Sequence, residues 1–283
     1  MNDSLNNNRK PKKSVSDSGK NIPVEWFVCP VEKTGLSLVN NKLLTQNNDV
    51  YEKNTKGNFW NFIPKNLKIF DNERWASWDI LQQNGVTTYA NDASKNLGVG
   101  PRKDFLDFAE FCNFYDLVLD IGVGPQRCPT HIEYNKKEDV FFIGIDPLKG
   151  DQPRDFAFVE ALGEYLPFKN NLFDQVLFVT SLDHFIDPVV ALKEAKRVMK
   201  KNGEICVWLG EKDKNAPKPT VSPEWYQKLA IPPGAEDPFH FKRFSTEEFK
   251  SYLTLAELTI KESKIIEVDK WRKNCFYKLI IRR

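Results

Sequence analysis

The residues with the clearest chemical potential lie in the stretch LVLDIGVGPQRCP (117–129). Asp120 follows an apolar run there and precedes Gly122 and Gly124, which one residue separates. Glycines at such a turn let the backbone bend tightly and approach a ligand closely. A dinucleotide-binding GxGxxG turn needs a third glycine where this chain has Arg127, so that site is disfavoured. The pattern predicts a ligand-binding turn with a carboxylate, and capping of the next helix is the alternative role of Asp120.

A second acid, Asp146, ends the next apolar run, residues 140–145. A carboxylate at a strand end can accept hydrogen bonds from both hydroxyls of a ribose, which a neutral side chain does less well. The alternative is a local turn before Pro147, because Asp side chains readily bond to the backbone two residues further on. We expect Asp146 to bind a ribose.

Apolar strands and helical patterns alternate from residue 116 onward, which places both acids at one edge of a sheet. Continuous apolar strands separated by helices predict a parallel sheet buried on both faces, as in a doubly wound α/β domain. Such sheets bind ligands at the carboxyl ends of their strands. The helix at 188–200 is expected to end at Asn202 and Gly203. The predicted strands are residues 117–119, 140–145, 173–179, 204–209, 263–268 and 275–281.

Three stretches together resemble class I S-adenosylmethionine-dependent methyltransferases with a methyltransferase-11-like domain. They are LVLDIGVGP, FFIGIDPLKG, and the long run that begins GEYLPF and ends NGEICVW. The resemblance covers residues 115–210 in register and 70–283 more loosely. It implies a seven-stranded, mostly parallel Rossmann-like sheet whose last strand is antiparallel, and S-adenosyl-L-methionine as the cofactor.

The resemblance also implies which residues bind the cofactor. The glycine turn should shape the site for the methionine part, Asp146 should hold the ribose, and residues near Glu164 should border the adenine. Two positions depart from the family: Gln126 replaces the third glycine, and Leu162 stands where an acid often meets the adenine amino group. Backbone groups around Gly163 or the carboxylate of Glu160 are the candidate substitutes. The implied cofactor-binding residues are Asp120, Ile121, Gly122, Gly124, Asp146, Pro147, Gly163, Glu164 and Thr180.

Methyl transfer is an in-line displacement in which alignment of donor and acceptor supplies much of the rate. A neutral oxygen or nitrogen acceptor can also need a base. His184 and Asp183 follow the strand at 173–179, beside the expected methyl group, and His240 lies in a later loop that could close over the substrate. We expect these three to be the catalytic candidates, with a structural hydrogen-bonding role as the alternative. His131 is expected to be incidental.

The chain is expected to have three parts. Residues 1–22 are rich in Asn, Ser and Lys and predict a disordered tail. Residues 23–66 predict a small β-rich appendage, and residues 67–283 form the methyltransferase domain. Within that domain, the proline-rich insertion at 211–243 is expected to contact substrate, with a surface excursion as the alternative.

The appendage resembles the zinc-ribbon-like segment that precedes some methyltransferases, with its ligands lost. Such ribbons hold tetrahedral zinc with four soft ligands in two CxxC pairs. Only Cys29 is present here, while Glu32, Thr45 and Asn48 occupy the other positions. We therefore expect no metal, and apolar packing must hold the segment together.

The composition sets the remaining expectations. Hydrophobic residues make up 41% of the 283 residues and the net charge is only +2, so bulk charge does not indicate a nucleic-acid partner. No run approaches the roughly 20 apolar residues of a membrane span, and no secretory signal is recognised at the start of the chain. Five cysteines without a CxxC pair favour a reducing cytoplasm.

The predicted function is therefore methyl transfer to an oxygen or nitrogen of a small molecule or saccharide-like metabolite. An RNA methyltransferase is an alternative, suggested by the ribbon-like segment and the basic tail. A non-catalytic binding module with the same fold is another, suggested by Gln126 and Leu162. An NAD-dependent dehydrogenase is disfavoured by the missing third glycine.

Overall fold

The computed structural model describes residues 21–64, 75–76, 103–135, 137, 139–150, 153–217, 227, 232–233 and 245–282. The predicted tail lies almost wholly outside these residues. So do most of the insertion at 211–243 and most of residues 65–102. None of the described helices is long and apolar enough to cross a membrane.

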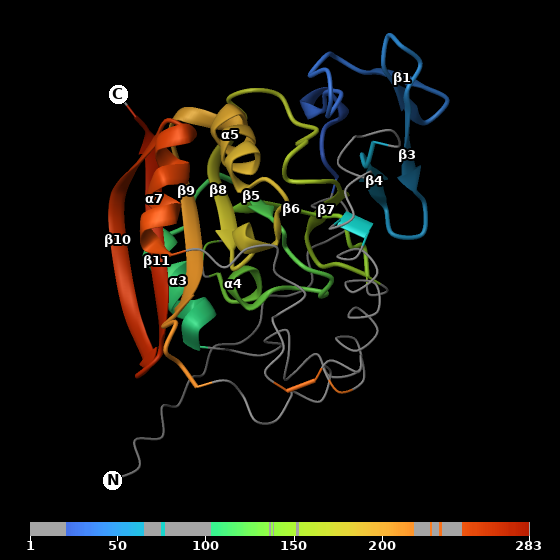
Figure 1. The fold of residues 1–283 in the computed structure, drawn as a ribbon. Helices are drawn as coiled ribbons and strands as arrows, with labels where there is room; N and C mark the ends of the chain where they lie inside the picture. The colour runs from blue at the N-terminus through green and yellow to red at the C-terminus, as the bar shows by residue number, and fades with distance from the viewer. Residues whose placement is uncertain are drawn as a thin grey trace.

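The described strands form one sheet in the order β1-β2-β3-β4-β7-β6-β5-β8-β9-β11-β10 (Figure 1). The strands are β1 (Ser37–Val39), β2 (Lys42–Leu44), β3 (Val50–Asn54), β4 (Phe59–Asn61), β5 (Leu117–Ile121), β6 (Phe141–Asp146), β7 (Ala157–Glu160), β8 (Phe173–Val179), β9 (Met199–Lys212), β10 (Leu258–Asp269) and β11 (Arg272–Ile281). The helices are η2 (Val24–Trp26), α3 (Lys103–Cys112), α4 (Thr130–Glu133), η4 (Leu182–His184), α5 (Pro188–Val198) and α7 (Thr246–Leu255).

The central part of the sheet confirms the predicted parallel architecture. Strands β7, β6, β5, β8 and β9 pair in parallel, and β11 runs antiparallel to both β9 and β10. Strands β7, β6, β5, β8, β9, β11 and β10 match the predicted seven-stranded sheet, but the described sheet has eleven strands, because the β-rich N-terminal strands join it. The N-terminal strands continue the sheet: β4 pairs in parallel with β7, and Trp60 lies opposite Val159.

Both faces of the central sheet are buried, as the continuous apolar strands predicted. Along β8, Val176 and Phe178 belong to one hydrophobic cluster, while Leu177 and Val179 belong to the other. Successive strand residues point to opposite faces, so a run that is apolar at every position needs cover on both sides. Residues of α5 and α7 cover one face and residues of α3 the other.

Two helix boundaries follow from local chemistry. Asp187 caps α5 by accepting hydrogen bonds from the N–H groups of Val189 and Val190, both at 3.0 Å. Ser245 and Glu248 form the capping box that starts α7. The predicted end of the first of these helices is wrong: α5 stops at Val198, because Met199 adopts an extended conformation and begins β9.

The N-terminal unit, residues 23–62, packs against the segment that follows β7. Phe27 stacks on Phe168 with ring centroids 5.6 Å apart, and the Val28 N–H donates to the Pro167 carbonyl at 3.0 Å. Where that segment begins, at the last residue of β7, the Phe62 N–H donates to the Glu160 carbonyl at 2.8 Å. Aromatic packing and backbone pairing therefore hold this unit on the sheet.

The likeness of the N-terminal unit to a zinc ribbon gains no support from the structure. The Cys29 thiol accepts a hydrogen bond from the Glu32 N–H and lies 3.6 Å from the Tyr51 hydroxyl. No group of three or more His, Cys, Asp or Glu side chains suited to a metal ion occurs in the described part of the chain.

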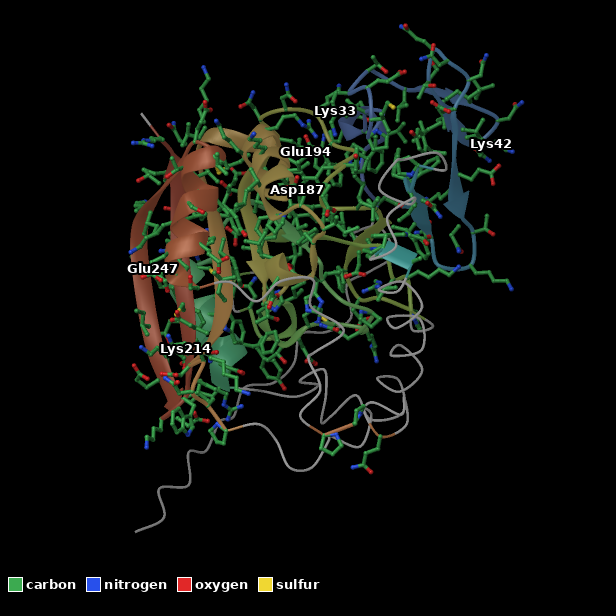
Figure 2. The ribbon with its side chains drawn as sticks, viewed as in Figure 1. Lys33, Lys42, Asp187, Glu194, Lys214 and Glu247 are labelled. Atoms are coloured by element: carbon green, nitrogen blue, oxygen red, sulfur yellow. The ribbon has the colours of Figure 1, made fainter. Side chains whose placement is uncertain are left out.

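An ion-pair network also ties the N-terminal unit to α5. Lys33 Nζ lies 2.5 Å from Glu194 Oε2, and the same ammonium donates to the carbonyls of Pro30 and Leu166 (Figure 2). Arg197 Nε lies 2.7 Å from the other oxygen of Glu194. Burial opposes ionisation of Glu194, but the hydrogen bonds and charges of Arg197 and Lys33 hold its pKa below the usual value.

Replacing Lys33 should therefore destabilise the fold. We expect Lys33→Met to lower the free energy of unfolding by about 1–3 kcal/mol, because it leaves a largely buried carboxylate with one partner fewer. Lys42→Met is the matched control in the same unit: its pair with Glu52 is exposed, so the change should stay within about 0.5 kcal/mol. Urea denaturation measures both.

The pH dependence provides a second check on this network. A depressed pKa of Glu194 means that its contribution to stability is present at neutral pH and is lost as the pH falls through that pKa. The stability difference between wild type and Lys33→Met should shrink over that acidic range. Equal losses of stability in the Lys33 and Lys42 variants would contradict the stabilising role of the Lys33–Glu194 ion pair.

Candidate ligand pocket at the carboxyl ends of the strands

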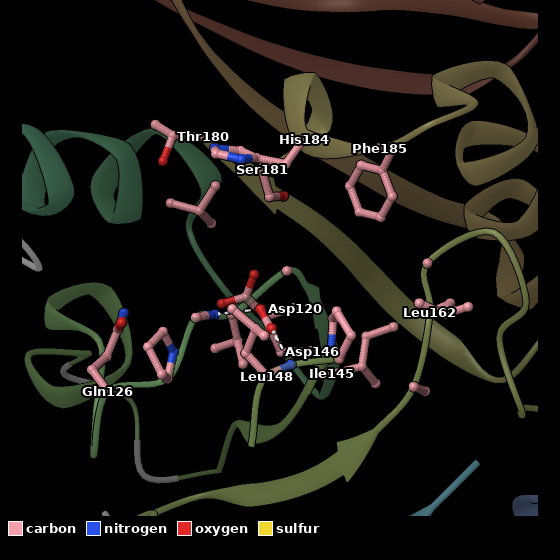
Figure 3. Close-up of a pocket in the computed structure, with 18 of the residues that line it drawn as sticks. Asp120, Gln126, Ile145, Asp146, Leu148, Leu162, Thr180, Ser181, His184 and Phe185 are labelled. Carbon is pink, nitrogen blue, oxygen red and sulfur yellow. Dashed lines mark hydrogen bonds between the residues drawn. The ribbon is translucent and has the colours of Figure 1, made fainter. Parts of the chain in front are cut away.

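A pocket of about 250 Å³ opens where β5, β6 and β8 end. Figure 3 shows Asp120 and Asp146 close together in it, with Thr180, Ser181 and His184 along one side. Most of its lining comes from four segments far apart in the sequence, which follow β5, β6, β7 and β8. The described lining residues are Trp75, Phe105, Asp120, Gly122, Val123, Gly124, Pro125, Gln126, His131, Ile145, Asp146, Pro147, Leu148, Ala161, Leu162, Gly163, Glu164, Val179, Thr180, Ser181, His184, Phe185 and Ile186.

The turn after β5 requires glycine at two positions. Gly122 and Gly124 have φ angles of 77° and 78°, a left-handed conformation that side chains disfavour. A Cβ atom on Gly122 would lie 2.5 Å from Cβ of Ser181, whose hydroxyl donates to the Ile121 carbonyl at 2.6 Å. This hydrogen bond fixes the end of β5 against the segment after β8. Ile121 itself is not among the lining residues.

Asp120 is fully buried and paired with His131. Asp120 Oδ2 lies 2.8 Å from His131 Nε2, and the imidazole stacks on Phe105 at 5.7 Å. Asp120 Oδ1 and His131 Nδ1 are also buried, and neither has a hydrogen-bond partner within the described structure. Buried polar atoms without partners are uncommon, and in a pocket they are typical of a site that a polar ligand completes. The expectation that His131 is incidental missed this contact.

Asp146 joins the two loops that border the pocket. Its Oδ2 accepts a hydrogen bond from the Gly124 N–H and its Oδ1 accepts one from the Leu148 N–H, both at 2.8 Å. Burial raises the pKa of Asp146 to about 6, while the two N–H groups and the charge of Arg154 act in the opposite direction. The turn that we considered as an alternative is present, yet each carboxylate oxygen keeps a second lone pair. The ribose-binding role stays a prediction.

Glu164 also lines the pocket and bonds to a neighbouring loop. Its carboxylate accepts from the N–H groups of Ile186 at 3.0 Å and Asp187 at 3.4 Å, and burial raises its pKa to about 7. A Cβ atom on Gly163 would lie 2.3 Å from the Phe185 ring, so glycine is needed for this close approach. Glu160, a candidate substitute for the missing adenine-contacting acid, is not among the lining residues.

The segment after β8 carries the catalytic candidates. Thr180 and His184 line the pocket, whereas Asp183 is buried and is not among the lining residues. Its predicted catalytic role and that of His184 stay predictions, and His240 lies outside the described residues. Thr180 has a φ of 54°, which costs a β-branched residue on the order of 1–3 kcal/mol. Such strain is often found at functional sites.

Most of the residues that line the pocket lie in the part of the chain that matches a known family. A family model described as a methyltransferase domain matches residues 119–207. An uncharacterized protein of Methanocaldococcus jannaschii is 35% identical over 99 residues, which cover 34% of this chain and 45% of that protein. The uncharacterized methyltransferase YcgJ of Bacillus subtilis is 26% identical over 183 residues, which cover 61% of this chain and 66% of that protein. The similarity thus spans less than two thirds of either relative.

A solved structure shares the fold over most of the chain. The 1,6-didemethyltoxoflavin-N1-methyltransferase of Burkholderia thailandensis, solved with S-adenosylhomocysteine, matches with a TM-score of 0.52 at 13% identity. The match covers 86% of this chain and 98% of that one. Identity this low shows the fold alone. Together with the family match, the fold supports the expected cofactor, S-adenosyl-L-methionine.

Adding one methyl group at Gly122 should damage the pocket. Gly122→Ala places a Cβ in the left-handed conformation and against Ser181, so we expect it to lower the free energy of unfolding by about 2–4 kcal/mol. Gly210→Ala is the control, because a Cβ on Gly210 meets no atom within 4 Å and its φ is not left-handed. Thermal and urea denaturation measure both variants. Equal stability of the two would contradict the requirement for glycine in this turn.

Proposed function

We propose that this chain is an S-adenosylmethionine-dependent methyltransferase that acts on an oxygen or nitrogen of a small molecule or saccharide-like metabolite. The observation that carries the proposal is the pocket at the ends of β5, β6 and β8. It combines a glycine turn in the left-handed conformation with two buried carboxylates, and Asp120 Oδ1 and His131 Nδ1 have no described partner there. The cofactor supplies a methyl group that is already activated by a sulfonium sulfur.

The chain's own residues fit such a cofactor. The unpartnered oxygen of Asp120 can accept from an ammonium group, and the unpartnered nitrogen of His131 can bond to the amino-acid end of the same ligand. The free lone pairs of Asp146 suit ribose hydroxyls. Leu148 and Leu162 supply apolar surface for a flat base. We therefore assign the methionine part to the β5 side and the nucleoside part to the β6 side.

The acceptor side of the pocket is formed after β8. Thr180 is exposed in the pocket, and His184 lies at the same rim. We propose His184 as the base when the acceptor needs to lose a proton, because a histidine imidazole is the side chain best suited to accept protons near neutral pH. We propose that the segment between them aligns the acceptor, because alignment supplies much of the rate in this reaction.

The choice of a small acceptor rests on the size of the pocket, about 250 Å³, and on the low net charge of +2. RNA binding would draw on basic surface and would depend strongly on salt. The sequence has five cysteines and no CxxC pair, which supports the proposal of a reducing cytoplasm. A non-catalytic module remains a distinct outcome of the binding test below.

Calorimetric titration with S-adenosylmethionine and S-adenosylhomocysteine tests the proposal, with NADH as the control. We expect saturable binding of both sulfur compounds and none of NADH. Asp146→Ala should weaken binding by about 10–100-fold, because it removes acceptors for the ribose. Absence of binding in the wild-type protein would contradict the methyltransferase and favour a non-catalytic module. Binding of NADH alone would favour a dehydrogenase.

The affinity should also depend on pH. Because burial raises the pKa of Asp146 to about 6, its carboxylate is ionised above that pH and becomes neutral below it. We expect the affinity for S-adenosylhomocysteine to fall as the pH is lowered through about 6 in the wild type. In Asp146→Asn this dependence should be weaker, because the amide does not ionise and only other groups of the pocket, such as Glu164, still titrate in this range. A wild-type profile identical to that of the variant would contradict the role of this carboxylate.

A further inference from the structure

Two loops from different strands form the floor of the pocket, the glycine turn after β5 and the loop after β6. They approach so closely that a Cβ atom on Gly150 would lie 2.7 Å from the Pro125 carbonyl oxygen. Gly150 has a left-handed φ of 64°, which a side chain would also disfavour. The relative position of the two loops therefore determines the shape of the pocket.

One buried side chain holds both loops by their carbonyl groups. Arg154 Nη1 donates to Gly124 at 2.7 Å and to Gln126 at 3.2 Å, and Nη2 donates to Leu148 and Lys149, both at 3.1 Å. Its guanidinium lies over the Phe158 ring, 3.7 Å from the centroid. Arg154 is only 8% exposed. The guanidinium is therefore shielded from solvent and contacts both loops through their backbone carbonyl groups.

Arg154 and Asp146 both form hydrogen bonds with the backbone of the same two residues, Gly124 and Leu148. Asp146 accepts from the N–H groups of Gly124 and Leu148, and Arg154 donates to the carbonyl groups of Gly124 and Leu148. One residue in each loop is thus held at both of its backbone polar groups by side chains of opposite charge. The arrangement leaves little freedom for either loop to shift alone.

We propose that Arg154 is the positioning residue of the cofactor pocket, a buried guanidinium that sets the spacing between the glycine turn and the loop after β6. The proposal rests on the proposed function and deepens it, because it assigns the cofactor affinity in part to a residue without cofactor contact. Arginine suits the role: its planar fork carries five donors, whereas a lysine ammonium at the same place cannot reach four carbonyls.

The charge of Arg154 has a second effect, on Asp146. Burial lowers the pKa of Arg154 to about 10, so it is cationic at neutral pH and opposes the burial that raises the pKa of Asp146. The other charged groups in this region are Asp120 from β5, Glu160 from β7, and Lys149 from the loop after β6. Loss of the Arg154 charge should therefore raise the pKa of Asp146 further.

The test compares Arg154→Met, Arg154→Lys and the control Arg127→Met. Arg127 lies in the same turn, but its side chain is 62% exposed and pairs with Asp155 at the surface. Calorimetry with S-adenosylhomocysteine gives the dissociation constant from about pH 5 to about pH 9. Hydrogen exchange of the free proteins reports the mobility of residues 122–127 and 147–150.

We expect Arg154→Met to weaken binding by about 30–100-fold at neutral pH, Arg154→Lys by about 10-fold, and Arg127→Met by less than about 2-fold. The pH at which affinity falls should move upward in Arg154→Met and stay near the wild-type value in Arg154→Lys. A merely structural role would reduce affinity by the same factor at every pH. Both loops should exchange faster in Arg154→Met than in Arg127→Met.

Several results would overturn the proposal: equal losses of affinity in the Arg154 and Arg127 variants, an unmoved pH profile, or unchanged exchange of the two loops. If Arg154→Met fails to fold, Arg154→Lys decides, and wild-type affinity in that variant rejects the role. If the wild-type protein binds no S-adenosylhomocysteine, the proposed function fails. The exchange of the free proteins then still decides whether Arg154 holds the loops.

Discussion

A buried carboxylate at the end of β6 is the interaction on which the pocket depends. Asp146 is 7% exposed, and its two oxygens accept hydrogen bonds from the turn after β5 and from its own loop. A desolvated carboxylate must find donors nearby, because an unpaired buried charge is costly. Gly124 turns its N–H toward this carboxylate from a left-handed conformation. The conformation of the glycine turn and the burial of Asp146 therefore depend on each other.

The N-terminal unit contributes to the same pocket from a distance. It holds the segment between β7 and α5 on both sides, through Phe62 before the pocket wall and Val28 after it. Residues 161–164 form that wall. The pairing of β4 also covers β7, which would otherwise be an exposed sheet edge. The unit is thus better described as an extension of the sheet than as an appendage.

Much of the central fold could be predicted from the sequence, because long apolar strands and capped helices have strong local patterns. Asp120, Gly122 and Asp146 were placed correctly at the edge of the sheet for the same reason. β7 was missed because its four residues carry little signal of their own. The end of α5 was misplaced because strand pairing extends back to Met199, in place of the helix that local propensity favoured.

The contacts that complete the pocket were beyond sequence reasoning for a different reason. His131 meets Asp120 only after the chain turns back on itself, and no motif marks the pair. Arg154 belongs to no recognisable motif. Its four hydrogen-bond acceptors are backbone carbonyl groups, which are present in every residue and leave no sequence pattern. Pairing of β4 with β7 likewise joins segments almost 100 positions apart along the chain. Such contacts depend on the tertiary structure.

The most direct test of the account is hydrogen exchange of the wild-type protein with and without S-adenosylhomocysteine. Bound ligand should slow exchange in the segments that supply most of the pocket lining, residues 120–126, 145–148, 161–164 and 179–186. Strands β1 to β3, which contribute no lining residues, should exchange at unchanged rates. Protection of the four pocket segments is the predicted result. No protection there, or protection confined to the N-terminal strands, would contradict the assignment of this pocket to the cofactor.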